Sequence, residues 1–515
     1  MTTTTGSILA ILAVLAAAPT PLIAAIPAPP PAAEYVPQRF VSVHDAIIAG
    51  HRMRYQAKVE EWITRMPDGA PGASIVTTSY ERTGGRAGEA RPVIFAFNGG
   101  PGSASIWLHL GLVGPRRIAF NDPTRPETTP PFRLTDNDES PLDVADIVLI
   151  DPPGTGFSTI LPAGKPAQFY GVHQDAELTV QLIERWIRDR RRWNSAKYLL
   201  SESYGTIRAA AVSRLLAGGP TETGNMDAVT LNGVILIGQA MDTRDGGDGR
   251  YLNVLPSLAA TACHFGKGPA GCTSTGQVAA AQGFAADAYL RALAQGARLS
   301  PADRAAAARE LSRLIGLPES EIQARDLRIG AKDFAKLLLA ADGREIGLYD
   351  ARYTLPLKAS GNDPVADDPA MGQYVPGFVA ALNTYLRDDL GVTIDRDYIP
   401  ISFRAVNSAW DYGMGPGIPP TRNFAEDLAV AMRRNPSLRL MVGTGLYDLV
   451  TPLGSADYVV AHAGIPLERT ELHLYESGHA AYLGDGARKA LAADVRAFVS
   501  APSGGVATAP VARRK

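Results

Sequence analysis

Five short, predominantly apolar runs constrain the fold of this chain more than any other feature of its sequence. Each run ends in a loop of glycine or small polar residues, as in the segment N-G-G-P-G at 98–102. Strands that are apolar on both faces suit a sheet that is covered on both sides. We therefore expect one buried sheet, built from residues 92–97, 147–150, 198–200, 234–237 and 438–442.

Helical patterns separate these runs. Leu178, Leu182 and Ile183 share one helical face, and Ile207 and Leu215 share another. The alternation of strand, helix and strand predicts an α/β fold with a mainly parallel central sheet flanked by helices. A β-rich segment at 55–80 precedes it and is expected to add antiparallel strands.

The alternation stops over residues 242–400, where Ala-rich helical stretches such as 277–295 and 301–315 take its place. We predict a largely helical cap insertion here, between a first part of the core at 41–241 and a second part at 401–500. An insertion at the loop end of a sheet is well placed to cover a site and to set its specificity.

The two ends of the chain differ in composition from its middle. Residues 1–25 have the shape of a signal peptide, with an apolar run at 8–18 that is shorter than the roughly 18 apolar residues of a membrane span. This favours an exported protein, periplasmic or secreted, without a membrane anchor after processing. The Pro/Ala-rich segment 26–40 is expected to be a linker, and 501–515 a disordered tail.

Charge and cysteine content narrow the function. Lys and Arg total 50 against 52 Asp and Glu, so no summed field favours nucleic acid or an anionic membrane. No Cys/His spacing indicates zinc, and we expect no cofactor. The two cysteines, Cys263 and Cys272, are compatible with a local disulfide in an exported protein or with two buried thiols.

The segment S-E-S-Y-G at 201–205 places Ser203 between a short apolar strand and an amphipathic helix. This is the arrangement of a nucleophile elbow, in which a tight turn exposes the serine hydroxyl at the amino end of a helix. Ser201 stands where the elbow motif usually has glycine. We predict that Ser203 is a catalytic nucleophile.

Acyl transfer also needs backbone N–H groups that bind the developing oxyanion. In a fold of this kind they come from the residue after the nucleophile, here Tyr204, and from an early glycine-rich loop, here Gly100.

A candidate acid and a candidate base follow in the order that α/β-hydrolases use. Asp448 and His479 each lie in a loop after a predicted strand, downstream of Ser203. His479 would accept the serine proton, while Asp448 would fix its tautomer. His473 alternates within a strand and Asp457 lies on an expected helix, so both fit these roles less well.

Together, N-G-G-P-G-S-A-S at 98–105, D-P-P-G-T-G-F-S at 151–158 and S-E-S-Y-G at 201–205 resemble the serine carboxypeptidases (peptidase family S10), which are α/β-hydrolases. The stretch 107–117 resembles the bacterial branch. The resemblance covers the chain from the first sheet strands to the last helix, apart from the insertion. It implies a Ser-His-Asp enzyme that removes C-terminal residues from peptides with a free C-terminus.

The resemblance also implies that Asn98, Gly99 and a protonated Glu202 bind the carboxylate of the substrate, which would favour activity at acidic pH. Two positions depart from the family pattern. Leu112 stands where a second carboxylate-binding acid is expected, and Ala96 where an aromatic residue is expected.

Several alternatives therefore stay open. Arg116 or Arg117 could bind the anionic end of a substrate, because a guanidinium can grip a carboxylate bidentately, or both could be solvated surface residues. The same triad could serve a serine esterase or an acyltransferase. A non-catalytic binding or protective protein is a third reading, which the intact triad disfavours. The oligomeric state is open, a homodimer included.

Overall fold

The computed structural model describes residues 35–66, 68–84, 90–244, 246–359, 361, 363–416, 418 and 421–501. The chain divides into two units, Met1–Val36 and Pro37–Lys515. Only Tyr35 and Val36 of the first unit are described, so the expected signal peptide and most of the linker lie outside the described residues, as does the tail after Ala501. All that follows concerns the second unit.

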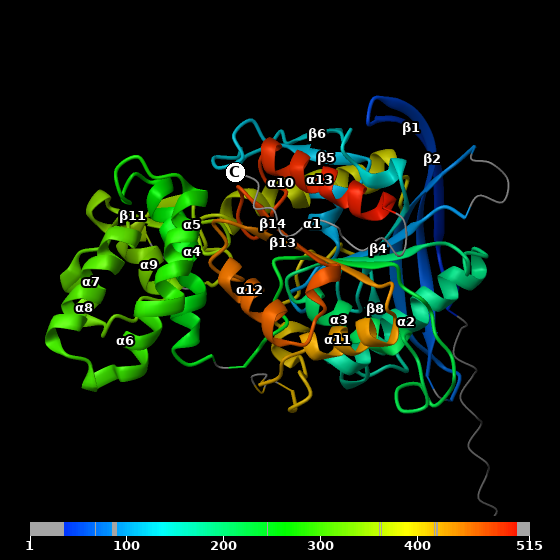
Figure 1. Ribbon diagram of the computed structural model, residues 1–515. Helices are drawn as coiled ribbons and strands as arrows, with labels where there is room; N and C mark the ends of the chain where they lie inside the picture. The colour runs from blue at the N-terminus through cyan, green and yellow to red at the C-terminus, as the bar shows by residue number, and fades with distance from the viewer. Residues whose placement is uncertain are drawn as a thin grey trace, which may run out of the picture. The chain divides into compact units, whose positions relative to one another are not determined.

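The core of this unit is a ten-stranded sheet with the order β1-β2-β3-β7-β4-β9-β10-β13-β14, in which β8 pairs with β3 (Figure 1). The strands from β7 to β14 along this path are parallel, whereas β1, β2 and β3 are antiparallel to their neighbours. The predicted α/β fold is confirmed. The strands are β1 (Arg39–Ile48), β2 (His51–Arg65), β3 (Pro71–Arg82), β4 (Val93–Phe97), β7 (Asp146–Asp151), β8 (Thr159–Ile160), β9 (Lys197–Glu202), β10 (Gly233–Ile237), β13 (Arg439–Gly445) and β14 (Thr470–Tyr475).

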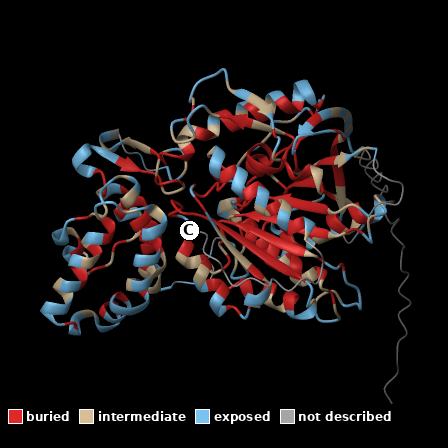
Figure 2. Ribbon diagram, turned by 45° about the horizontal axis from the view of Figure 1, so that its top comes forward, coloured by how far each residue is buried: buried red, intermediate tan, exposed pale blue. Residues whose placement is uncertain are grey.

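The apolar runs form strands because helices cover both faces of the sheet. Strands β4, β7, β9, β10 and β13 are buried along their whole length, as Figure 2 shows in red. Alternate side chains of one strand point to opposite faces. Accordingly, Ile94 and Ala96 join one hydrophobic cluster, whereas Val93, Phe95 and Phe97 join another.

Each face has its own helices. The cluster that contains Phe95 is covered by α2 (Val172–Asp189), α3 (Gly205–Leu216), α11 (Ala425–Arg434) and α12 (Leu453–His462). The cluster that contains Ile94 is covered by α1 (Ile106–Leu108), the π-helical turn His109–Val113, α10 (Met371–Thr384) and α13 (Asp485–Ser500). A small sheet of β5 (Arg116–Ala119) and β6 (Arg133–Asp136) lies on the same side as α10 (Figure 1).

The expected insertion contains a separately packed helical part. A third hydrophobic cluster of the protein lies in this part. It contains residues of α4 (Gly249–His264), α5 (Ser274–Phe284), α6 (Leu290–Gln295), α7 (Pro301–Ile315), α8 (Glu319–Ala324), α9 (Ala331–Leu337) and the strand β11 (Arg344–Ile346). Strand β11 pairs with β12 (Thr354–Pro356). Helix α10 packs instead on the core, where Phe378 contacts Trp107 of α1. The separate packing therefore ends near Ala351, well before residue 400. At the other end, β1 begins at Arg39, inside the segment expected to be a linker.

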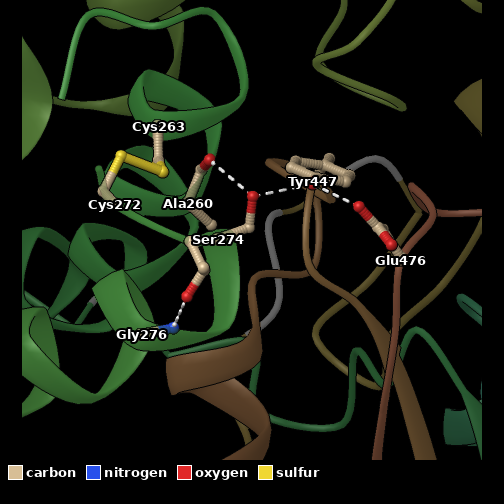
Figure 3. Close-up of a disulfide and its surroundings, with 8 residues drawn as sticks. Ala260, Cys263, Cys272, Ser274, Gly276, Tyr447 and Glu476 are labelled. Atoms are coloured by element: carbon tan, nitrogen blue, oxygen red, sulfur yellow. Dashed lines mark hydrogen bonds between the residues drawn. A yellow bond between two sulfur atoms is a disulfide. The ribbon is translucent and has the colours of Figure 1, made fainter. Parts of the chain in front are cut away.

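Among the described residues, no helix combines the length and apolar character needed to cross a membrane. Cys263, near the end of α4, and Cys272, just before α5, form a disulfide (Figure 3). Of the two possibilities that the sequence left open, a local disulfide or two buried thiols, the structure has the disulfide.

The disulfide closes a loop with a sequence separation of 9 residues. Loss of a cross-link over so short a loop costs about 2 to 3 kcal/mol by the chain-entropy model. We expect the double variant Cys263→Ser/Cys272→Ser to lose that much unfolding free energy in urea titration. Wild-type protein treated with a reductant is the control, and it should move to the value of the variant. Equal unfolding curves for all three samples would contradict the prediction.

Candidate active site

Ser203 lies on a strained turn between β9 and α3. Its φ is +59°, in the left-handed region that residues with a side chain rarely adopt, and its N–H donates to Ile237 O at 3.0 Å. Such backbone strain concentrates at functional sites. Gly205 allows the turn, because an added Cβ would lie 2.9 Å from Asn98 O. Ser203 is partly exposed, whereas Glu202 and Tyr204 beside it are buried.

Ser201, which replaces the usual glycine, is fully buried within β9. It pairs with Phe97 of β4 on one side and with Leu236 of β10 on the other. Its hydroxyl donates to Ile235 O at 3.5 Å. A serine is small enough for this central position, so the replacement leaves the elbow intact.

Asp448 and His479 are in direct contact. The loops after β13 and β14 bring His479 Nδ1 to 2.8 Å from Asp448 Oδ2, and both side chains are buried. The other oxygen, Oδ1, accepts the N–H groups of Val450 and Thr451 at 2.8 and 2.9 Å. The Thr451 hydroxyl also donates to Oδ2. A carboxylate with this many donors is held as an acceptor, so that Nδ1 of His479 carries its proton toward Asp448.

The electrostatic environment favours a charged His479. Burial alone lowers the pKa of its imidazole, but the carboxylates of Asp448 and Glu202 outweigh burial and raise the pKa above its ordinary value. A base with this environment stabilises the imidazolium that proton transfer from a serine would create.

The sheet places Ser203 and His479 near each other. Ile237 at the end of β10 accepts the Ser203 N–H, and a Cβ added to the next residue, Gly238, would lie 3.2 Å from His479 Cε1 and Nδ1. No hydrogen bond joins the Ser203 hydroxyl to His479 within the described chain. In enzymes without substrate this bond is often long, and it tightens when substrate binds.

The glycine-rich loop lies directly against the elbow. A Cβ added at Gly99 would lie 2.5 Å from Tyr204 N and 2.9 Å from Ser203 Cβ. Gly100 has a φ of +103°, which favours glycine. In the part of the chain that the structure describes, neither the Gly100 N–H nor the Tyr204 N–H donates a hydrogen bond. Both remain free for the predicted oxyanion role.

Asn98 and Glu202 lie at the same end of the sheet. Asn98 is buried, and its Oδ1 accepts the Leu108 N–H at 3.0 Å, while its Nδ2 has no hydrogen-bond partner among the described residues. Glu202 accepts a hydrogen bond from the Tyr482 hydroxyl at 2.7 Å. Burial raises the pKa of Glu202 to about 7, against the opposing effects of His479, Tyr482 and Asn98.

The sequence did not indicate Tyr482 or Thr451 as site residues. Tyr482 lies beside the segment that carries Leu112, since a Cβ added at Gly111 would lie 2.3 Å from the Tyr482 ring. Leu112 itself is part of the hydrophobic core. A tyrosine hydroxyl, rather than a second acid, is thus the partner of Glu202. In the sequence, only the position of Tyr482 three residues after His479 pointed to the site, and this spacing becomes informative only when the folded loop is known.

The structure does not bring Arg116 or Arg117 to these residues. Both lie on β5, where Arg116 forms an ion pair with Asp136 at 2.7 Å and Arg117 donates to Ile118 O at 3.3 Å. The alternative base and the alternative acid, which the sequence analysis set aside, have other partners. His473 lies between Asp494 and Glu471, and Asp457 accepts a hydrogen bond from Gln282.

Comparisons with known proteins agree with this geometry. Residues 80–254 match the profile of the family described as serine carboxypeptidase. Over this segment, about a third of the chain, the protein resembles the serine carboxypeptidases, which are hydrolases. The matched segment contains β4, the glycine-rich loop, β7, β9 and the Ser203 elbow. No curated protein sequence matches the chain significantly.

The chain is similar in structure to Kex1(delta)p, a prohormone-processing carboxypeptidase from Saccharomyces cerevisiae. The match has a TM-score of 0.55 at 14% identity and covers 86% of this chain and 90% of that one. A monoglyceride lipase from the same yeast matches with a TM-score of 0.35 at 11% identity, over 85% of this chain and 95% of that one. The first match supports the α/β-hydrolase fold. The second is too distant to support an argument.

The raised pKa of Glu202 makes a prediction about stability. Its pKa is 4.5 ordinarily and about 7 in the folded protein, so folding favours the neutral form. The stability that it contributes is complete below pH 4.5 and is lost as the pH rises to about 7. We therefore expect Glu202→Gln, which is neutral throughout, to melt at a higher temperature than wild type at pH 8 but not at pH 4.

The measurement is the thermal midpoint of both proteins at each pH. The half-exposed Glu177 gives a matched control, because Glu177→Gln should show no such pH-dependent gain. A Glu202→Gln midpoint below wild type at pH 8 would mean that the buried carboxyl is ionised and needed for folding.

Proposed function

We propose that this chain is an exported serine carboxypeptidase that cleaves C-terminal residues from peptides through Ser203, His479 and Asp448. The observation that carries the proposal is the buried His479–Asp448 hydrogen bond beside a strained, partly exposed Ser203. The match of residues 80–254 to the serine carboxypeptidase profile supports it independently. Export rests on the sequence of residues 1–25.

The chemistry is a two-step acyl transfer. The Ser203 hydroxyl attacks the peptide carbonyl while its proton passes to Nε2 of His479. The carbonyl oxygen, now negative, accepts the N–H groups of Gly100 and Tyr204. His479 then protonates the departing amine. Water attacks the acyl-enzyme by the same proton path and regenerates the serine.

Recognition of the free C-terminus is assigned to Asn98 and Glu202. Among the described residues, no acceptor lies within hydrogen-bonding distance of the buried Asn98 Nδ2, although Asn98 is close enough to Glu202 to oppose the rise of its pKa. A carboxylate of the substrate would satisfy this donor. Neutral Glu202 can donate its own proton to a carboxylate. Ionised Glu202 would repel one. Gly99 keeps the loop close enough to the elbow for both contacts.

Leu112 and Ala96 favour a second candidate, an esterase or acyltransferase. With Leu112 in the hydrophobic core, Glu202 is the only acid of the pair expected from the family. A substrate without a carboxylate would then need neither Asn98 nor Glu202 for binding. The pH experiment below separates the two candidates.

The nucleophile is tested by Ser203→Ala. Loss of a catalytic serine removes about 10⁶-fold in kcat. Ser201→Ala is the matched control, a serine two residues away in the same motif, and its activity should stay within a few-fold of wild type. Hydrolysis of peptides and esters by Ser203→Ala, or labelling of another residue by a serine-directed phosphonate, would refute the assignment.

Substrate class is tested by the pH dependence of kcat/KM. For a free-acid peptide we expect kcat/KM to fall as the pH rises through about 7, because Glu202 then ionises. For the peptide amide and for a simple ester, no such fall is expected. Glu202→Gln keeps a donor at every pH and should abolish the fall for the free acid.

Equal kcat/KM for acid, amide and ester at all pH values would favour the esterase or acyltransferase instead. Lack of an acylation burst with every activated ester would point to the non-catalytic alternative.

A further inference from the structure

Residues 348–352 of the insertion run between the loop that carries Asp448 and the loop that carries His479. We call these five residues the strap. Leu348 O accepts the N–H of Leu449, and the N–H of Ala351 donates to Tyr447 O, both at 3.0 Å. The strap is therefore hydrogen-bonded to the residues on both sides of Asp448.

The same segment also binds the other loop. The His479 N–H donates to Tyr349 O at 2.6 Å, so the backbone of the candidate base itself is bound to the strap. The Tyr349 ring meets the imidazole edge to face, with 5.3 Å between ring centroids. The imidazole thus has Asp448 at Nδ1 and the Tyr349 ring beside it, nearly perpendicular to it.

Glycines allow these three segments to approach so closely. A Cβ added at Gly478 would lie 2.4 Å from both Tyr349 O and Asp350 Cβ, and one added at Gly445 would lie 2.0 Å from Gly478 O. Any side chain at either position would push the loops apart.

A buried ion pair completes the contact. Arg352 binds Asp350 with both ends of its guanidinium, Nε to Oδ1 at 2.9 Å and Nη2 to Oδ2 at 2.6 Å. Its Nη1 donates to Glu476 O at 2.9 Å, and the guanidinium lies 5.2 Å from the centre of the Tyr447 ring. Arg352 therefore contacts both loops at once while remaining paired.

The strap is itself anchored within the core. The buried carboxylate of Asp368 accepts the Leu348 N–H at 2.6 Å and also the N–H groups of Ala370 and Met371, where α10 begins. From the helical part, Ser274 at the start of α5 bonds the Tyr447 hydroxyl at 2.9 Å, and that hydroxyl lies 3.3 Å from Glu476 Oε1 (Figure 3).

We propose that the strap sets the distance between Asp448 and His479, with Arg352 as the positioning residue for the reaction inferred above. The proposal rests on the proposed function for its kinetic consequences only. The strap contacts the backbone on both sides of Asp448 and the backbone and ring of His479, rather than the expected substrate groups Asn98 and Glu202. Its loss should therefore impair proton transfer and leave substrate binding unchanged.

The test variant is Arg352→Met, which keeps an apolar stem over Tyr447 but removes the bonds to Asp350 and Glu476. We expect kcat to fall roughly 10- to 100-fold, as a displacement of about 1 Å does elsewhere. KM should change less than roughly twofold, because the lost interaction acts on chemistry. The low-field proton resonance of His479 Nδ1–H, which reports its hydrogen bond to Asp448, should weaken or move upfield.

The pH profile supplies a readout that a merely structural role would not change. The carboxylates that act on His479 are Asp448, Glu202 and Asp368, and the Asp448 bond raises the pKa of the imidazole. A loosened bond lowers that pKa, so the acidic limb of kcat should move to lower pH. Simple destabilisation would lower the melting temperature without moving this limb.

Arg328→Met is the matched control. Arg328 also binds an aspartate of the insertion bidentately, with Nε and Nη2 at 2.8 and 2.7 Å from the two oxygens of Asp248. None of its described hydrogen bonds reaches the Asp448 or His479 loops. Its variant should keep kcat, the acidic limb and the resonance.

Arg352→Lys covers the case in which the methionine variant does not fold. A lysine can still pair with Asp350, but a single ammonium cannot replace the planar fork that also reaches Glu476. It should shift the limb and the resonance in the same direction by a smaller amount. An unchanged resonance and limb in a folded Arg352→Lys, or equal effects of Arg352→Met and Arg328→Met, would overturn the proposal. The resonance can be measured without substrate. If the variants change the resonance but the wild-type protein cleaves no peptide, the proposed function is wrong, whereas the positioning role of the strap is supported.

Discussion

The hydrogen bond between His479 Nδ1 and Asp448 Oδ2 is the interaction around which the site is organised. The carboxylate of Asp448 is fully buried. Burial of a charged carboxylate lowers the stability of the folded protein unless donors bind its oxygens. Val450 and Thr451 supply those donors from the same loop. The position of Asp448 is therefore fixed locally, and the remaining problem for the fold is to bring His479 to it and hold it there.

Two hydrophobic clusters meet at this hydrogen bond. Leu446, Tyr447 and Leu449, which flank Asp448, belong to the cluster of the helical insertion. The residues around His479, including Tyr475 and Tyr482, belong to a cluster on one face of the sheet. Because the acid and the base are attached to different packing units, neither cluster alone determines their separation. Backbone hydrogen bonds join the two loops directly, from Leu446 N–H to Tyr475 O and from Tyr447 N–H to Ser477 O, and residues 348–352 add contacts to both loops.

The sequence predicted the sheet well because full burial of its central strands excludes polar residues and leaves continuous apolar runs. It indicated candidate site residues because Ser203, Asp448 and His479 each lie in a loop after a predicted strand, and the structure brings Asp448 and His479 into contact. It could not predict Tyr482 as the partner of Glu202, or Tyr349 as a neighbour of His479, since these contacts join segments 280 and 130 residues apart. Local patterns also could not show which helices of the insertion pack on the core: α10 is helical like its neighbours, and its contact through Phe378 with Trp107 places it there.

The insertion therefore contributes backbone contacts to the candidate site itself. A loop between sheet strands usually tolerates change because its contacts are with solvent or substrate. Here the segment between β11 and β12 is hydrogen-bonded to His479 and to both neighbours of Asp448, whereas α6, α7 and α8 have no such contact among the described hydrogen bonds. Changes in α6, α7 and α8 leave these hydrogen bonds intact. Changes between β11 and β12 affect the His479–Asp448 pair first, and any exchange of the insertion for another must preserve that segment.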